Sequence, residues 1–452
     1  MSDLFDKDLD SAASPAARRE SGRSHDPYAA LRHRDFRLFL ANSVAATIGG
    51  EMQSVAVGWE LYERTSSKLA LAFVGLVQAL PVLLLALPAG LVADRFSRKK
   101  VVLATAAAIT CGSIGLAAVS WLHAPVAWFY VFLAIIGIAG AFSFPARWAF
   151  MPELVPGEDF HNAVTWRSSA WQVAAMVGPG LGGLGIALFK TATPVYLADA
   201  ACGVVVCAMI ASIRSRPAVN KKSDPMTWDT FAAGFRFVWS SPLVLAAITL
   251  DMFAVLLGGA TALLPVFAKD ILHIGPTGLG LLRAAPSLGA LSTALYMAHR
   301  PPLQRAGRDL LLAVTGFGVA TIVFGLSRDP ILSFAMLVLT GVFDNISVVI
   351  RSTLIQLRTP DAMRGRVASV NSIFIGMSNE VGSFESGSAA WLIGTVPAVV
   401  LGGIGCIVVV ILTAIKWPEI VRLGPLDKLG EETDRVVIPD IPCTPLEIEG
   451  HR

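Results

Sequence analysis

Residues 90–100 read Gly-Leu-Val-Ala-Asp-Arg-Phe-Ser-Arg-Lys-Lys, a charged turn between two apolar stretches of the chain. The flanking stretches, 69–93 and 101–121, are each long enough to cross a membrane. An α-helix rises about 1.5 Å per residue, so about 20 residues span the hydrocarbon layer. Five of the seven residues in 94–100 are charged and cannot lie in lipid. The turn therefore marks a sharp return of the chain at a membrane face.

The composition supports this interpretation for the whole chain. Of its 452 residues, 54% are hydrophobic and only 15% are charged, whereas about 25% are charged in an average soluble protein. The five cysteines form no pair with the spacing of a metal site. We expect an integral membrane protein that needs no metal and no cofactor.

Twelve apolar segments can be marked along the sequence. They lie at 36–62, 69–93, 101–121, 125–147, 163–189, 194–213, 243–267, 276–299, 309–326, 331–351, 367–394 and 396–417. The fold class that this pattern predicts is an all-α membrane protein with twelve transmembrane helices.

The distribution of Lys and Arg predicts the orientation. The N-terminal stretch and the loops that follow even-numbered segments hold 25 Lys and Arg, whereas the remaining loops hold five. Because cytoplasmic loops carry the excess of positive charge, we expect both termini in the cytoplasm and the protein in the bacterial cell (inner) membrane.

The longest internal polar stretch, near 214–241, separates six apolar segments from six others. Trp228, Phe231, Phe235 and Trp239 recur in it at helical spacing, which predicts an amphipathic helix on the membrane surface. We expect these parts: a disordered cytoplasmic tail at 1–30, an N-terminal six-helix bundle at 31–213, a linker with the amphipathic helix at 214–242, a C-terminal six-helix bundle at 243–417 and a cytoplasmic tail at 418–452.

The pattern Gly-x-x-x-Asp-Arg-x-x-Arg-Lys at 90–99 resembles the loop between helices 2 and 3 of the major facilitator superfamily, with Ser97 where Gly is usual. Residues 144–156 and 358–367 are similar to loops of its branch of siderophore exporters and transmembrane secretion effectors. The resemblance implies two six-helix bundles and transport by alternating access.

The resemblance also implies a role for the charged turn as a cytoplasmic gate. Asp94 would pair with a nearby arginine such as Arg147, while the turn holds the two halves together in the outward-open state. The simpler alternative is a positively charged membrane anchor without a mechanism. The residues assigned to the gate are Gly90, Asp94, Arg95, Arg98, Lys99 and Arg147.

A second motif, Gly-Pro-x-x-Gly-Gly, lies in the fifth apolar segment at Gly178, Pro179, Gly182 and Gly183. It resembles the helix-5 motif of superfamily antiporters, which are mostly exporters. Small residues let helices approach closely, so ordinary packing is the alternative. The stretch also matches G-x-G-x-x-G, but no strand precedes it, so we reject a dinucleotide site.

Ionisable residues inside the spans are candidates for coupling and substrate binding, because they are costly to bury in lipid. Their depths predict two polar layers in the C-terminal half. The deeper layer on the cytoplasmic side holds Asp251, Asp344 and Arg351. The other layer holds Arg283 with Glu380 or Glu385.

In the N-terminal half, Glu51 lies near the middle of the first span and has no evident basic partner within that half. It is therefore the first candidate for a proton-carrying carboxylate. The alternative for each of these acids is a structural hydrogen bond or ion pair between helices.

The sequence thus predicts a secondary active transporter, and the family resemblance implies proton-coupled export of a siderophore, drug or metabolite. The chain has no Walker A motif, which leaves the proton gradient as the expected driving force. We expect a monomer that contacts its substrate, protons and lipid, and no nucleic acid. An importer and a transporter-like sensor without net flux stay open, whereas a membrane enzyme is disfavoured.

Overall fold

The computed structural model describes residues 26–425 except 215–227, 301–303 and 361–362. The parts of the expected tails and linker that fall on the remaining residues lie outside the described chain. The described residues form helices and no strand, as the fold class requires.

Along the chain, α9 (Trp228–Ser240) separates two groups of long helices. The first group contains α3 (Arg34–Thr65), α4 (Lys68–Arg95), α5 (Arg98–Trp121), α6 (Ala127–Phe150), α7 (Phe160–Phe189) and α8 (Thr193–Ser212). The second group contains α10 (Pro242–Leu257), α12 (Gly275–Ala298), α13 (Ala306–Leu326), α14 (Pro330–Arg358), α15 (Arg364–Ile393) and α16 (Thr395–Lys416). These ends lie within a few residues of most of the apolar segments marked in the sequence.

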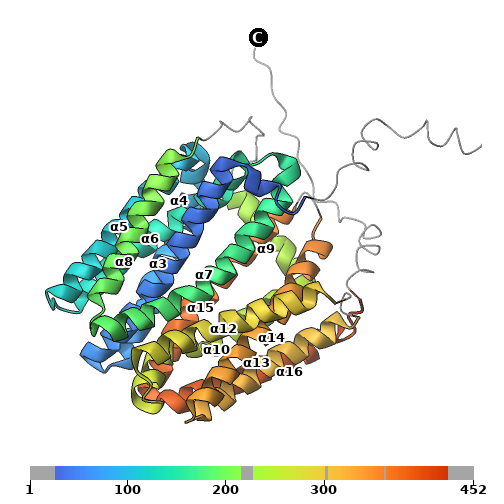
Figure 1. Cartoon of the computed structure of the whole chain (residues 1–452). Coiled ribbons are helices and arrows are strands. Elements are labelled where there is room, and N and C mark those ends of the chain that lie inside the picture. The colour runs from blue at the N-terminus through green and yellow to red at the C-terminus, as the bar shows by residue number, and fades with distance from the viewer. Residues whose placement is uncertain (1–25, 215–227, 301–303, 361–362, 426–452) are drawn as a thin grey trace, which may run out of the picture.

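The main contacts between the groups are those of α7 with α12 and of α4 with α15. We call the side on which α4 ends and α5 begins the basic side, and the side on which α3 ends and α4 begins the far side. In Figure 1 the two groups lie together at the lower left and separate toward the upper right.

The hydrophobic core also joins the two groups on one side of the molecule only. One large cluster near the far side draws on both groups, with Leu61 and Tyr62 from the first group and Phe267 and Leu279 from the second. The buried clusters near the basic side each belong to one group: Phe36 and its neighbours to the first and the residues around Ile355 to the second. The molecule is therefore sealed by shared apolar packing on its far side.

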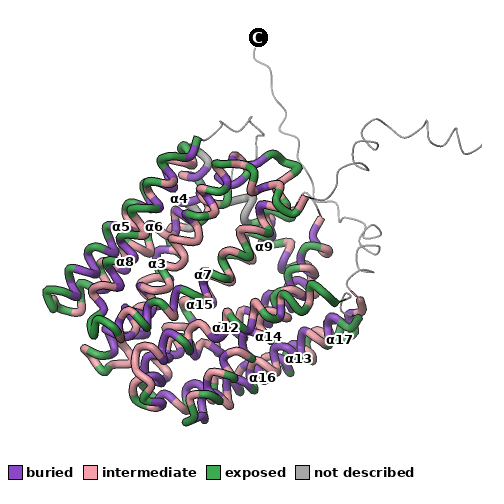
Figure 2. The backbone as a smooth tube through the Cα atoms, in the orientation of Figure 1, coloured by how far each residue is buried: buried purple, intermediate pink, exposed green. Residues whose placement is uncertain are grey.

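Nine helical segments among the described residues are long and apolar enough to cross a membrane. Apolar side chains are exposed along the outer faces of the helices, as the green stretches of Figure 2 show. On α7 they form a stripe of Val173, Val177, Leu181, Leu184 and Leu188. A soluble monomer rarely exposes such a surface, so these stripes contact lipid.

Three long helices fall short of that apolar threshold, namely α3, α12 and α15. They carry the in-span candidates Glu51, Arg283, Glu380 and Glu385. These three helices thus hold four of the ionisable candidates, whereas Asp251, Asp344 and Arg351 lie on α10 and α14, which meet the threshold.

The span expected at 243–267 is not one continuous helix. Helix α10 ends at Leu257, and after Gly258 and Gly259 the chain continues through short 3₁₀ and α-helical turns to a π-helix at Phe267–Ile271. Irregular backbone within a membrane is tolerated where protein covers it, and Leu263, Leu264 and Phe267 are fully buried.

The packed part of the chain extends beyond the tail boundaries expected at residues 30 and 418. Ala30 is fully buried, and its N–H donates to Asn162 of α7. Ile420, in the short helix α17 (Pro418–Val421), is also fully buried. Apolar residues next to the last predicted span continue its packing, which a reading of overall polarity does not reveal.

The glycine motif of α7 lies between α3 of its own group and α12 of the other group. A Cβ on Gly178 would lie 2.7 Å from Cβ of Glu51, and one on Gly182 would lie 2.9 Å from Cα of Met52. On the opposite face, a Cβ on Gly183 would lie 2.4 Å from the carbonyl oxygen of Pro276 in α12. The backbones therefore approach closely on two sides of α7.

We predict that Gly183→Ala lowers the free energy of unfolding by about 1–3 kcal/mol, because the new methyl group must push the α12 backbone away. The matched control is Gly180→Ala on the same helix, where a Cβ meets nothing within 4 Å. Thermal unfolding of the purified protein in detergent compares the two. Equal midpoints of thermal unfolding for the two variants would show that the α12 backbone does not restrict the space at Gly183.

Candidate functional site

The basic residues after α4 contact the first helix group itself. Arg98 donates to Glu153 at 3.0 Å and to the carbonyl of Ala149 at 3.0 Å. Lys99 donates to the carbonyls of Ala211 and Ile213 at 2.8 and 2.6 Å. The turn thereby ties the start of α5 to the basic-side ends of α6 and α8.

The other gate residues also lie in the first group. Gly90 is buried near the end of α4, and Arg95 is exposed. Arg147 donates to Asn42 at 3.1 Å and to Ser143 at 3.2 Å. The side chain of Asp94 lies outside the described residues, so its pairing stays a prediction.

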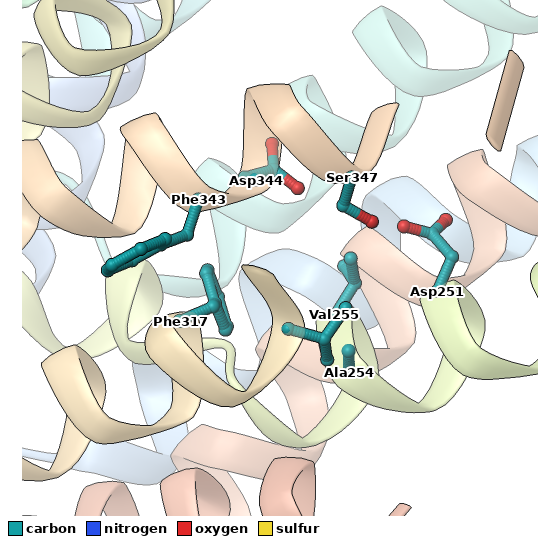
Figure 3. A pocket seen from close by; sticks show the side chains of 8 residues that line it. Asp251, Ala254, Val255, Phe317, Phe343, Asp344 and Ser347 are labelled. Carbon is teal, nitrogen blue, oxygen red and sulfur yellow. The ribbon is translucent and has the colours of Figure 1, made fainter. Parts of the chain in front are cut away.

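The deeper polar layer comes together within the second group. Arg351 of α14 forms an ion pair with Asp251 of α10, and both side chains are at most 10% exposed. Asp251 and Asp344 line the same cavity of about 10 Å³, together with Ser347 (Figure 3). That volume is roughly what one water molecule needs.

The second polar layer differs from the expectation, because its arginine reaches into the first group. Arg283 of α12 lies 3.9 Å from a carboxylate oxygen of Glu51 and donates to Ser54 at 2.6 Å. It also acts electrostatically on Glu380 of α15. Glu385, further along α15, instead accepts a bond from Ser386 at 3.3 Å.

Glu51 thus has a basic partner, which comes from the other helix group. The expectation that Glu51 lacks a basic partner held only for its own half of the chain, so this pair was not predicted. The available signal was depth: Glu51 and Arg283 both lie well inside their spans, so they can meet where the two groups touch.

Another contact between the groups lies on the far side. The hydroxyl of Tyr62 in α3 donates to Asp270, and the amine of Lys269 lies 5.6 Å from the centre of the Tyr62 ring. The π-helix at Phe267–Ile271 places both charged residues there, and such helices are frequent at functional sites. No sequence pattern pointed to this contact.

The described residues contain no group of three His, Cys, Asp or Glu side chains placed to hold a metal ion. The candidate site consists of paired charges and aromatic side chains. Such groups can bind and release an organic molecule or a proton, but they supply no obvious bond-breaking chemistry.

Solved transporter structures share this fold. The nucleoside transporter NupG matches with a TM-score of 0.65 and 12% identity, over 85% of this chain and 99% of NupG. The D-xylose-proton symporter matches with a TM-score of 0.65 and 13% identity, over 84% of this chain and 96% of the symporter. A bacterial homologue of the human lysosomal transporter Spinster, in an inward-facing and unoccupied conformation, matches with a TM-score of 0.62 and 14% identity, over 91% of this chain and 99% of the homologue.

Curated relatives are more similar in sequence. The enterobactin exporter EntS of Citrobacter koseri is 27% identical over 334 residues, which cover 74% of this chain and 80% of that protein. EntS of Escherichia coli O1:K1 / APEC shows the same identity and coverage.

The family model described as transmembrane secretion effector, MFS_3, matches residues 25–432. The chain is a multi-pass membrane transporter and not an enzyme. It belongs to the transmembrane secretion effector family of the major facilitator superfamily.

Proposed function

We propose that this protein is a secondary active exporter that moves a small organic molecule outward in exchange for protons. Two six-helix bundles, 31–213 and 243–417, would alternate access to a site between them. The observation that carries the proposal is the ion pair of Glu51 with Arg283, which links the two groups beside the sealed far side.

The Lys and Arg excess assigns the basic side to the cytoplasm and the far side to the exterior. With this orientation the conformation is inward-facing, because the shared core and the Tyr62–Asp270 contact close the outer side. The gate formed by Gly90, Asp94, Arg95, Arg98, Lys99 and Arg147 would join the bundles only in the outward-open state.

The two ion pairs suit different roles. Arg283 and Glu51 are 27% and 32% exposed, and such partly exposed pairs are worth about 0–1 kcal/mol, weak enough to break in each cycle. Arg351 and Asp251 are buried, where loss of one partner typically costs about 3–5 kcal/mol. We therefore assign coupling to Glu51, Arg283 and Glu380, and bundle integrity to Asp251 and Arg351.

Asp344 and Glu385 remain secondary candidates for coupling. Asp344 faces the water-sized cavity, which a proton could reach through a bound water. The relatives' name makes enterobactin the first substrate to test. Import and sensing without net flux are the alternatives.

Flux in proteoliposomes of the full chain tests the proposal. We expect iron-free enterobactin to accumulate when the lumen is acidic and not when it is alkaline, because antiport moves substrate against the proton flow. Accumulation with an alkaline lumen would indicate symport and thus import. Absence of gradient-driven flux for enterobactin and a panel of drugs would favour a sensor.

We predict that Glu51→Gln lowers substrate-driven proton movement at least roughly tenfold, in the range typical of coupling between sites. The amide keeps the size of the side chain but cannot carry the proton. A pH-sensitive dye inside the vesicles measures the movement. The control is Glu63→Gln, an exposed carboxylate on the same helix, and full coupling in the Glu51 variant would refute the assignment.

We predict that Tyr62→Phe shifts the protein toward the outward-open state by a few-fold to about tenfold, because it removes one hydrogen bond to a charged group. Spin labels on His123→Cys and Arg328→Cys, in a background without native cysteines, report the far-side distance. The control is Tyr130→Phe, whose hydroxyl donates to Ala70 within the first group. Identical distance distributions for both variants would show that the Tyr62 hydroxyl does not hold the far side closed.

A further inference from the structure

Two arginines lie near each other on the basic side of the first group. Arg147 is close to the end of α6, next to Trp148, whose ring carries the guanidinium of Arg167 from α7, so the two positive charges repel each other. The hydrogen bonds of Arg147 go to the neutral side chains of Asn42 and Ser143. Among the side chains that the structure describes, neither arginine has a carboxylate partner.

Like charges at short range repel each other, and the repulsion is strong where water is scarce. An anion between two guanidinium groups would relieve it and accept charge-assisted hydrogen bonds from both. The pair therefore has the electrostatics of an anion receptor.

Aromatic side chains lie on the same two helices as the pair. The Arg167 guanidinium lies 3.6 Å from the ring centre of Trp148. Trp148, Phe144 and Trp171 are 41%, 58% and 55% exposed, so each still offers ring surface to a ligand. Cations over aromatic faces and exposed rings favour a flat, aromatic partner.

Interfacial anchoring in lipid is the other explanation for exposed tryptophans, and the helical positions argue against it. Successive residues advance by about 100°, so Phe144 lies roughly 180° around α6 from the exposed Ile135. Trp171 lies roughly 160° around α7 from Val173, in the lipid-facing stripe. The contact of Arg167 with Trp148 also joins α7 to α6.

We propose that Arg147 and Arg167, together with Phe144, Trp148 and Trp171, bind an aromatic organic anion on the basic side. This inference rests on the proposed function, in which the site is where substrate loads from the cytoplasm. The guanidinium groups hold the anionic group, and the rings hold the aromatic part.

Calorimetric titration of the purified full-length protein in detergent tests the site. We expect 1-naphthoate to bind at least about tenfold more tightly than 1-naphthylmethanol, which lacks the charge, and than cyclohexanecarboxylate, which lacks the aromatic ring. Comparable binding of all three compounds would overturn the proposal.

Substitutions of the proposed binding residues test whether naphthoate binds at this site. Arg167→Gln and Trp148→Leu should each weaken naphthoate binding about tenfold or more, and Arg167→Lys should restore part of the Arg167→Gln loss because it keeps the charge. The control is Arg300→Gln, since Arg300 also stacks on an aromatic ring, that of Tyr296 at 5.0 Å, but belongs to the second group. Equal losses for the Gln and Lys variants, or the same loss in the control, would overturn the site.

Naphthoate binding is measured without transport, so its result can be separated from that of the flux experiment. Thermal unfolding of each variant first establishes that it is folded. Gradient-driven export without naphthoate binding would refute this inference alone, whereas naphthoate binding without gradient-driven flux would refute the proposed function alone.

Discussion

The cost of placing a charge in hydrocarbon is the constraint on which this molecule depends. Each ionisable side chain in a span needs a partner or access to water. Asp251 finds Arg351 within its own group, whereas Glu51 finds Arg283 across the boundary between groups. The first pair is buried within one group, and the second joins a charge of one group to a charge of the other. In the proposed transport cycle, this contact links the charge state of Glu51 to motion between the groups.

Much of the fold could be predicted from the sequence because a membrane makes length and charge informative. The charged turn at 94–100 correctly located the return between α4 and α5, and the segment at 163–189 matches α7 (Phe160–Phe189). The break after Leu257 was not predicted, because a Gly-Gly pair is tolerated in continuous transmembrane helices as well. Only the surrounding packing decides whether such a pair interrupts a helix.

The candidate site was harder to predict. Depth along a helix predicted a polar layer of Asp251, Asp344 and Arg351, and the structure brings Asp251 and Asp344 to one cavity, since both belong to the same group and keep their relative positions. The pairing of Arg283 with Glu51 depends on how the groups dock, which helical spacing does not encode. The contact of Tyr62 with Asp270 also depends on how the groups dock, because the two residues are 208 positions apart in the chain.

The close approach of α7 and α12 at Gly183 and Gly280 has a mechanical consequence. Most packed helices interlock through side-chain ridges and grooves, and sliding them requires many side chains to change rotamer. At these glycines, backbone meets backbone and no ridge engages. If the two groups rock against each other as proposed, this interface would require few side chains to change rotamer.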